Sequence, residues 1–145
     1  MALTHLNPAT LHRNPAFSQG VVIEPGSRLL IVGGQNGVDA TGVVVGPGLG
    51  EQTLQALRNV LAVLHEVGAT QEDVARLTIH LVAGSDVRAA FEASREVWGT
   101  HATAVTVLMV ASLGRPECLV EIDALAAVPG RAEALRAATG DRATS

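Results

Sequence analysis

The feature that most constrains the fold is a run from Ala104 to Leu113 that is almost entirely apolar and has no strong helical period. Such a run predicts a β-strand that is buried on both faces. The next segment, Leu119 to Val128, alternates, with Glu121 and Asp123 on one side and aliphatic residues on the other. The chain therefore has to form a sheet, and part of that sheet has to be covered on both faces.

Further strands are expected on both sides of the chain's centre. Residues 19–24 and 29–32 are rich in Val, Ile and Leu, and Pro25-Gly26-Ser27 between them has the composition of a hairpin turn. A third short strand is expected at residues 43–45, and another at 77–82. Each is short and is bounded by glycine or polar residues.

Two amphipathic helices are predicted. The first covers about residues 51–67 and ends at Gly68, where a left-handed residue is expected. A single turn with a capping box follows at Thr70. Ser85 is expected to cap the second helix, which ends at Gly99. The apolar stripe of that second helix consists of Val87, Ala90, Phe91, Ser94, Val97 and Trp98.

This order of elements predicts an α+β sandwich, with both helices packed on one face of a sheet. With 145 residues, 48% of them hydrophobic, the chain can form one domain with its own core. We expect an extended lead-in outside the core at residues 1–14, the domain at 15–129, and a short helix with a polar tail at 130–145. The second face of the sheet is expected to be buried against other copies of the chain, with a site at the seam between them.

Composition excludes several kinds of chemistry. The ten basic residues are all arginine, and the chain has no tyrosine, so a lysine Schiff base and a phenolic acid or base are absent. A net charge of −4 argues against nucleic-acid binding. Cys118 is the only cysteine, and no run is long enough to span a membrane. We expect a cytoplasmic protein without an internal disulfide.

Glu121 is the leading acid for chemistry, because an acid inside an otherwise apolar strand is suited to general acid–base work. The alternative is that Glu121 and Asp123 mark a solvated face of the strand. His80 is a candidate proton donor or, alternatively, a structural histidine. His101 faces either a pocket or solvent.

Three other features have a structural and a functional interpretation. The polar turn from Gln35 to Asp39 either lines a pocket or is a plain turn. Cys118 begins a strand and is interpreted as a packing residue. The five histidines show no metal-ligand spacing, so no metal is expected.

Several motifs, in order, resemble the RidA/YjgF family of reactive intermediate deaminases (Rid), also called L-PSP endoribonuclease-like. They are Asn14-Pro15-Ala16-Phe17-Ser18-Gln19-Gly20, Val32-Gly33-Gly34-Gln35, Glu51-Gln52-Thr53-Leu54-Gln55-Ala56-Leu57-Arg58-Asn59-Val60, Gly68-Ala69, the strand around Thr78, and Leu119-Val120-Glu121-Ile122-Asp123-Ala124-Leu125-Ala126. The resemblance implies a chorismate-mutase-like fold, a homotrimer with three inter-subunit pockets, and hydrolysis of 2-imino acids without metal or cofactor. In the family an arginine clamps the substrate carboxylate, and a glutamate positions or activates water.

This sequence departs from the family pattern at the arginine, whose position is occupied by Val105. Glu121 remains as the expected catalytic residue. The expected substrate-binding positions are Phe17 (in place of Tyr), Gly33 (in place of Ser), Gly34, Phe91 (where Asn is frequent), Val105 and Val107 (where Cys is frequent). Backbone amides near Gly34 and Val107 are expected to polarise the substrate. Arg115 either supplies a replacement cation or lies on the surface.

The departures predict a less polar pocket and a poor fit to 2-iminobutanoate or 2-iminopropanoate. The leading hypothesis is a cofactor-independent hydrolase of a small reactive imine, enamine or carbonyl compound. The alternative is a non-catalytic trimer that binds a small metabolite or a protein. An endoribonuclease is disfavoured by the negative charge, the absence of lysine and the near absence of aromatic residues.

Overall fold

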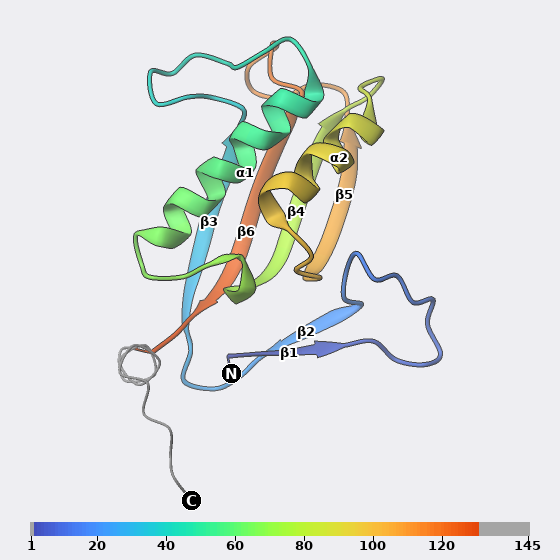
Figure 1. Ribbon diagram of the computed structural model, residues 1–145, viewed down its shortest axis with the longest axis vertical. Coiled ribbons are helices and arrows are strands. Elements are labelled where there is room, and N and C mark those ends of the chain that lie inside the picture. The colour runs from blue at the N-terminus through green and yellow to red at the C-terminus, as the bar shows by residue number, and fades with distance from the viewer. Residues whose placement is uncertain (1, 131–145) are drawn as a thin grey trace, which may run out of the picture.

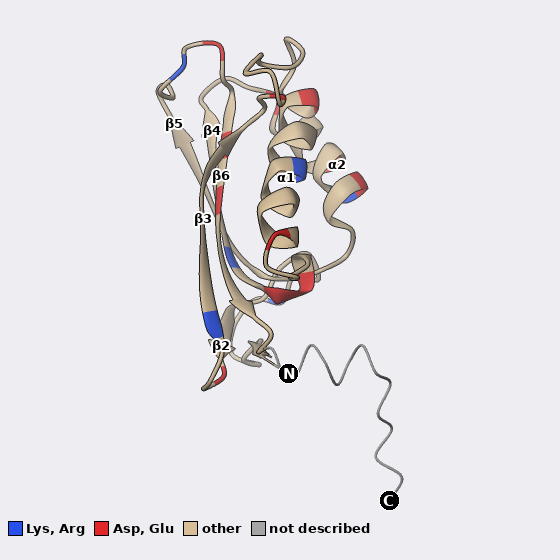
Figure 2. Cartoon of the chain, turned by 90° about the vertical axis from the view of Figure 1, so that its left-hand side faces the viewer, with Lys and Arg blue, Asp and Glu red and all other residues tan. Residues whose placement is uncertain are grey.

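The computed structural model describes residues 2–130. Its elements are β1 (Leu3–Leu6), β2 (Gly20–Ile23), β3 (Arg28–Asn36), α1 (Leu49–His65), the 3₁₀ turn η1 (Gln71–Asp73), β4 (Val74–Val82), α2 (Val87–Trp98), β5 (Ala104–Val110) and β6 (Val120–Val128). Four strands form the main sheet in the order β3-β6-β4-β5, and β1 pairs with β2 in a separate two-stranded sheet (Figure 1). Both helices lie on one side of the main sheet (Figure 2). The predicted α+β class is confirmed.

The main sheet is mixed. β6 lies between β3 and β4 and is antiparallel to both, whereas β4 and β5 are parallel and are joined by α2. A parallel pair needs a crossover connection, and α2 supplies it. α2 and β5 therefore follow one another in the chain and lie side by side at the edge of the molecule (Figure 1).

The core lies between the helices and the sheet. Alternate residues of β6 are buried there, including Val120, Ile122 and Ala126, each with no exposed surface. Leu57 and Leu64 of α1 pack against this layer. The alternation predicted for the last strand is confirmed, because Glu121 and Asp123 lie on the opposite side and are half-buried.

The helix ends follow the predicted signals with one difference. Gly68 has φ of 73° and Gly99 has φ of 71°, as expected of residues that end helices. Thr70 caps the 3₁₀ turn as predicted. The cap of α2 is Asp86 and not Ser85, because the Asp86 carboxylate accepts hydrogen bonds from the amides of residues 88 and 89.

The predicted hairpin between β2 and β3 is wrong. β2 pairs instead with β1, so Leu3 is buried and packs with Ala75 and Ala127, where the sequence predicted a lead-in outside the core. β3 pairs along β6, which offers it nine residues, whereas β2 has only four. The longer ladder satisfies more backbone groups of β3 than a local hairpin would.

Two other expectations differ from the structure. Residues 43–45 form no strand, and only one isolated bridge joins Val38 to Val44. β5 ends at Val110 and lies at the sheet edge, where Val107, Leu108 and Met109 are each about half exposed. The chain itself therefore does not bury this strand on both faces. The helix expected after Gly130 lies outside the described residues.

No helix within residues 2–130 has the length and apolar character needed to cross a membrane.

Candidate functional site

A cavity of about 700 Å³ lies on the helix side of the sheet. Its walls are α2, the helix-facing residues of β4 and β5, and residues 14–17 of the N-terminal loop. The volume falls within the range of small-molecule sites, about 300–1,000 Å³. The lining residues are mostly aliphatic or aromatic, which makes this an apolar cavity with a few polar groups at its wall.

Four of the predicted site residues meet at this cavity. Phe17 comes from the N-terminal loop, Phe91 from α2, and Val105 and Val107 from β5. In the parallel register, Val105 lies beside Leu77 of β4, and Val107 lies beside the next helix-facing residue of that strand. Position 105 therefore points into the cavity, and its side chain there is an uncharged isopropyl group.

Glu121 lies on the opposite face of the same sheet. Its register partners are His80 of β4 and Asn36 of β3, and Glu121 is not part of the cavity lining. The structure therefore divides the predicted site into two groups that a single chain does not bring together. One is the apolar cavity, and the other is the group around Glu121, which we call the Glu121 face.

Gly34 lies directly against Glu121. A Cβ atom at position 34 would come within 2.8 Å of the Glu121 carboxyl carbon, which is closer than real contacts allow. A Cβ atom at position 33 would meet no other atom within 4 Å. β3 is irregular between Val32 and Gln35. Glycine at position 34 is thus needed for the backbone to approach the carboxylate, whereas glycine at position 33 is not needed for that reason.

The two candidate histidines lie in different places. His80 is half-buried beside Glu121, and its Nδ1 atom is buried without a hydrogen-bond partner among the described residues. His101 lines the cavity, its Nε2 lies 3.3 Å from the carbonyl oxygen of Val74, and its ring centroid is 6.5 Å from that of Trp98. His101 therefore faces a pocket, and His80 belongs to the Glu121 face.

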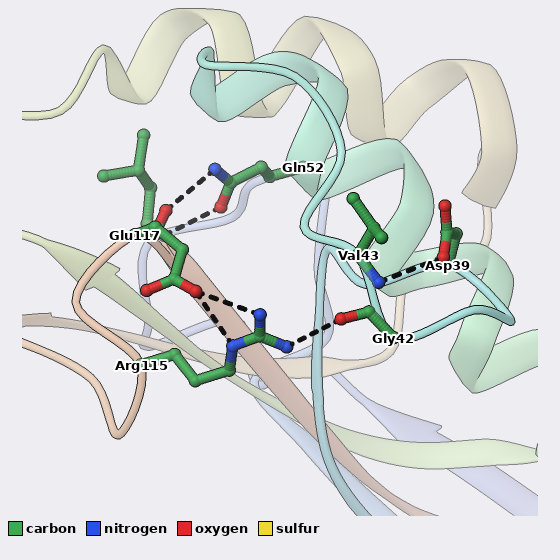
Figure 3. Close-up of polar contacts among 7 residues, drawn as sticks. Asp39, Gly42, Val43, Gln52, Arg115 and Glu117 are labelled. Atoms are coloured by element: carbon green, nitrogen blue, oxygen red, sulfur yellow. Dashed lines mark hydrogen bonds and ion pairs between the residues drawn. The ribbon is translucent and has the colours of Figure 1, made fainter.

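Arg115 does not reach the cavity. Its Nε lies 3.1 Å and its Nη2 2.9 Å from Glu117 Oε1, and its Nη1 donates to the carbonyl oxygen of Gly42 at 3.1 Å (Figure 3). The backbone amide of Glu117 and the Arg115 guanidinium lower the pKa of the Glu117 carboxyl. Arg115 thus ties the loop before β6 to the loop after β3 at the surface.

The sequence assigned no role to two polar residues of α1, the buried Gln52 and the half-buried Asn59. The Gln52 amide donates to the carbonyl oxygen of Glu117 at 3.1 Å and accepts from the amide of Leu119 at 2.8 Å (Figure 3). Asn59 donates to the carbonyl oxygens of residues 36 and 38. Gln52 and Asn59 are seven residues apart and share one stripe of α1, but this is not the leucine stripe, so the helical pattern gave no signal for them. These amides fix the loops at the edge of the Glu121 face.

Cys118 is fully buried, and burial raises the pKa of its thiol. The thiol is therefore protonated near neutral pH and is a packing group, which agrees with its sequence-based interpretation. Within residues 2–130, no cluster of three His, Cys, Asp or Glu residues is arranged to hold a metal ion.

Comparison with known proteins connects this architecture to one family. The family model described as endoribonuclease L-PSP matches residues 9–128. A RutC family protein of Pyrococcus abyssi is 30% identical over 111 residues, which are 76% of this chain and 84% of the relative. A second RutC family protein, from Pyrococcus horikoshii, is 32% identical over 98 residues, covering 67% of this chain and 77% of the relative.

Solved structures of the same family resemble this fold. A Rid family protein of unknown function from Yersinia pestis has a TM-score of 0.79 at 33% identity, covering 88% of this chain and 100% of that protein. A YjgF/YER057c/UK114 family member from Mycobacterium tuberculosis has a TM-score of 0.60 at 32% identity, covering 77% and 86%. The order of motifs, the sheet topology and these matches together place the chain in the RidA/YjgF family, whose family model carries the name endoribonuclease L-PSP.

Proposed function

We propose that this protein binds a small imine, enamine or carbonyl compound in the apolar cavity and hydrolyses it with Glu121 of a neighbouring copy. The observation that carries the proposal is the character of the cavity where Val105 and Val107 enter it. Both are aliphatic, and the aromatic rings of Phe17 and Phe91 form other parts of the wall. An uncharged reacting group is therefore favoured in the interior over a small carboxylate.

The contribution of a second copy follows from the separation of the two groups. Glu121 lies on the face opposite to the cavity, so one chain alone cannot present both to the same ligand. β5 lies at the sheet edge, and three of its apolar residues are about half exposed. A homotrimer in which this edge meets the Glu121 face of the next copy would bring the two groups together and cover that apolar surface.

In this arrangement the reaction is an ordinary imine hydrolysis. The Glu121 carboxylate orients a water molecule and takes a proton as the water oxygen bonds to the imine carbon. The proton then passes to the nitrogen and gives a carbinolamine. A second proton moves through Glu121 from the new hydroxyl group to the nitrogen, the carbon–nitrogen bond breaks, and the products are a carbonyl compound and ammonia. Backbone amides near Gly34 and Val107 are the proposed donors to the polarised substrate atom.

The experiment compares the native protein with Val105→Arg, Val105→Leu and Glu121→Ala on 2-iminopropanoate, following release of the 2-oxo acid. We expect little turnover by the native protein, and a gain of about ten- to hundredfold in Val105→Arg, because a charge-assisted contact is worth roughly 1.5–3 kcal/mol. Val105→Leu controls for the change of size. Strong Glu121-dependent turnover of 2-iminopropanoate by the native protein would contradict the proposal that the cavity interior disfavours a small carboxylate.

A non-catalytic binding module is the second candidate. It is favoured by the observation that the cavity is lined without Glu121. Ligands from a metabolite screen that bind equally to the native protein and to Glu121→Ala, with no turnover of any imine offered, would select this alternative.

A further inference from the structure

One residue in the cavity wall was assigned no function by the sequence and differs in kind from its neighbours. Among the described residues that line the cavity, Arg95 is the only Arg, Lys, Asp or Glu. It lies in the last turn of α2 and is exposed. An exposed residue that also lines the cavity lies at its mouth, where a long side chain can place its aliphatic stem on the apolar wall and keep its guanidinium in solvent.

The helical spacing supports this placement. Ser94 and Arg95 each lie three or four residues from both Phe91 and Trp98, so the four residues form one stripe of α2, and all of them line the cavity. Phe91 and Trp98 supply apolar surface along this stripe. Arg95 lies between them in sequence, so a ligand against the two rings also has a cation within the same stripe.

Trp98 provides an independent observation. Its side chain is 7% exposed, it lines the cavity, and its indole N–H is buried without a hydrogen-bond partner among the described residues. Because the nitrogen atom is buried, the cavity meets the carbon surface of the indole ring and not its N–H. The wall thus combines one cation with aromatic surface on the same stripe of α2.

We propose that the cavity takes an amphipathic monocarboxylate, whose apolar body lies along Phe91 and Val107 and whose carboxylate is held by Arg95. The anchor comes from the helix, and not from position 105 of the strand. The carboxylate and the buried part of the ligand are therefore at different ends of the cavity, which favours longer, apolar acids. This inference rests on the proposed function of the cavity as a ligand site and names its ligand class.

The test uses the fact that Trp98 is the only tryptophan in a chain without tyrosine. Octanoate and octanol are the probes, because they share an apolar body and differ in charge. Each is titrated while Trp98 fluorescence and the single indole N–H resonance are followed. We expect octanoate to bind about fivefold more tightly than octanol at low salt, which is the ratio that an exposed ion pair supports, and the preference to shrink at high salt.

Two variants assign the preference to Arg95. Arg95→Gln is expected to abolish it, whereas Arg88→Gln is expected to keep it, because Arg88 lies on the same helix, pairs with Glu92 and does not line the cavity. Ser94→Phe fills the cavity and should prevent both probes from perturbing Trp98. Circular dichroism verifies that each variant is folded.

The outcomes separate this inference from the function on which it rests. Equal affinity for the two probes in the native protein, or a preference that survives Arg95→Gln, overturns the carboxylate anchor and leaves the cavity as a ligand site. If neither probe perturbs Trp98 in the native protein, or if both still perturb it in a folded Ser94→Phe variant, the proposed cavity site is overturned as well.

Discussion

The two faces of the main sheet differ in what the chain itself provides to cover them. On the helix-covered face, Val32, Ile122 and Leu57 are almost wholly buried, and packing within one chain is sufficient. On the opposite face, Leu29 is 60% and Ile31 80% exposed, and the polar residues of the Glu121 face lie nearby. Within the described residues, the chain covers only the helix-side face of the sheet.

This difference explains why one chain holds half of the proposed chemistry. The helix side contains the cavity, whose lining among the described residues includes no acid, whereas Glu121 lies on the other side. Exposed apolar residues beside a half-buried acid are typical of a surface that another protein copy covers. The predictions below test that difference, from the largest expected effect to the smallest.

Leu64→Ala tests the helix-covered face. Leu64 of α1 has no exposed surface, so the substitution is expected to lower the free energy of unfolding by about 2–5 kcal/mol. Urea unfolding measures the loss. Leu11→Ala is the control, because Leu11 is 51% exposed and its truncation should change the free energy by less than about 0.5 kcal/mol. Equal losses would mean that this face is not the core.

Ile31→Glu tests the opposite face. A charge at this position should leave the fold of one chain intact but prevent its burial against another copy. Sedimentation is expected to give a homotrimer for the native protein and a single chain for the variant. Val43→Glu, in a loop outside the sheet and 57% exposed, should remain assembled. If the native protein sediments as a single chain, the proposal that another copy buries this face is wrong.

Gly34→Ala tests the position of the Glu121 carboxylate. The added methyl group overlaps the Glu121 side chain and should displace it, lowering Glu121-dependent imine turnover by about ten- to hundredfold. Gly33→Ala meets open space and should have little effect. When Glu121→Ala is already present, Gly34→Ala should cause no further loss. Full activity in folded Gly34→Ala would contradict a role for this carboxylate.

Asp39→Asn gives the smallest expected effect and tests the loop after β3. Hydrogen bonds from the Thr41 hydroxyl and from the amides of Val43 and Thr41 lower the pKa of Asp39 in the folded protein. Its carboxylate therefore stabilises the fold above about pH 4, and this contribution is lost as the pH falls through the lowered pKa. Melting temperatures at pH 6 and pH 3 should differ less in the variant.

The control for that loop is Thr41→Val, which removes the largest cause of the lowered pKa and should reduce the same pH dependence. Because Asp39 is only partly buried, the difference between variant and native protein is expected to be a small shift of the melting temperature. A pH profile identical to that of the native protein would mean that these hydrogen bonds do not contribute to stability.

Local patterns predicted most of the fold. The alternation around Glu121 located β6 and its two sides, and the glycines at 68 and 99 located the helix ends. The pairing of β2 was not predictable in this way, because the Pro25-Gly26 turn resembles a hairpin, whereas the competing partner of β3 lies at the other end of the chain. The pairing partner of β3 depends on the length of the ladder that each candidate strand can form, and local composition contains no information about that length.

The sequence identified residues of the candidate site but did not show which of them lie together. The positions of Phe17, Phe91, Val105 and Val107 came from the family resemblance, and the structure brings them to one cavity. Their separation from Glu121 depends on the register of β6 against β4, which a sequence pattern alone does not provide. Arg95 was missed because a charged residue beside an apolar helix stripe is ordinarily a solvent-facing residue.

The crossover from β4 through α2 to β5 has a consequence for how such a protein diversifies. α2 and β5 are consecutive, so the stretch from Val87 to Val110 carries Arg95, Val105 and much of the cavity wall, while Glu121 lies outside it. Under the proposed function, this one stretch carries many of the residues that contact the ligand, and the acid lies outside it. Grafting this stretch from a relative should exchange the ligand preference and leave the remaining scaffold unchanged.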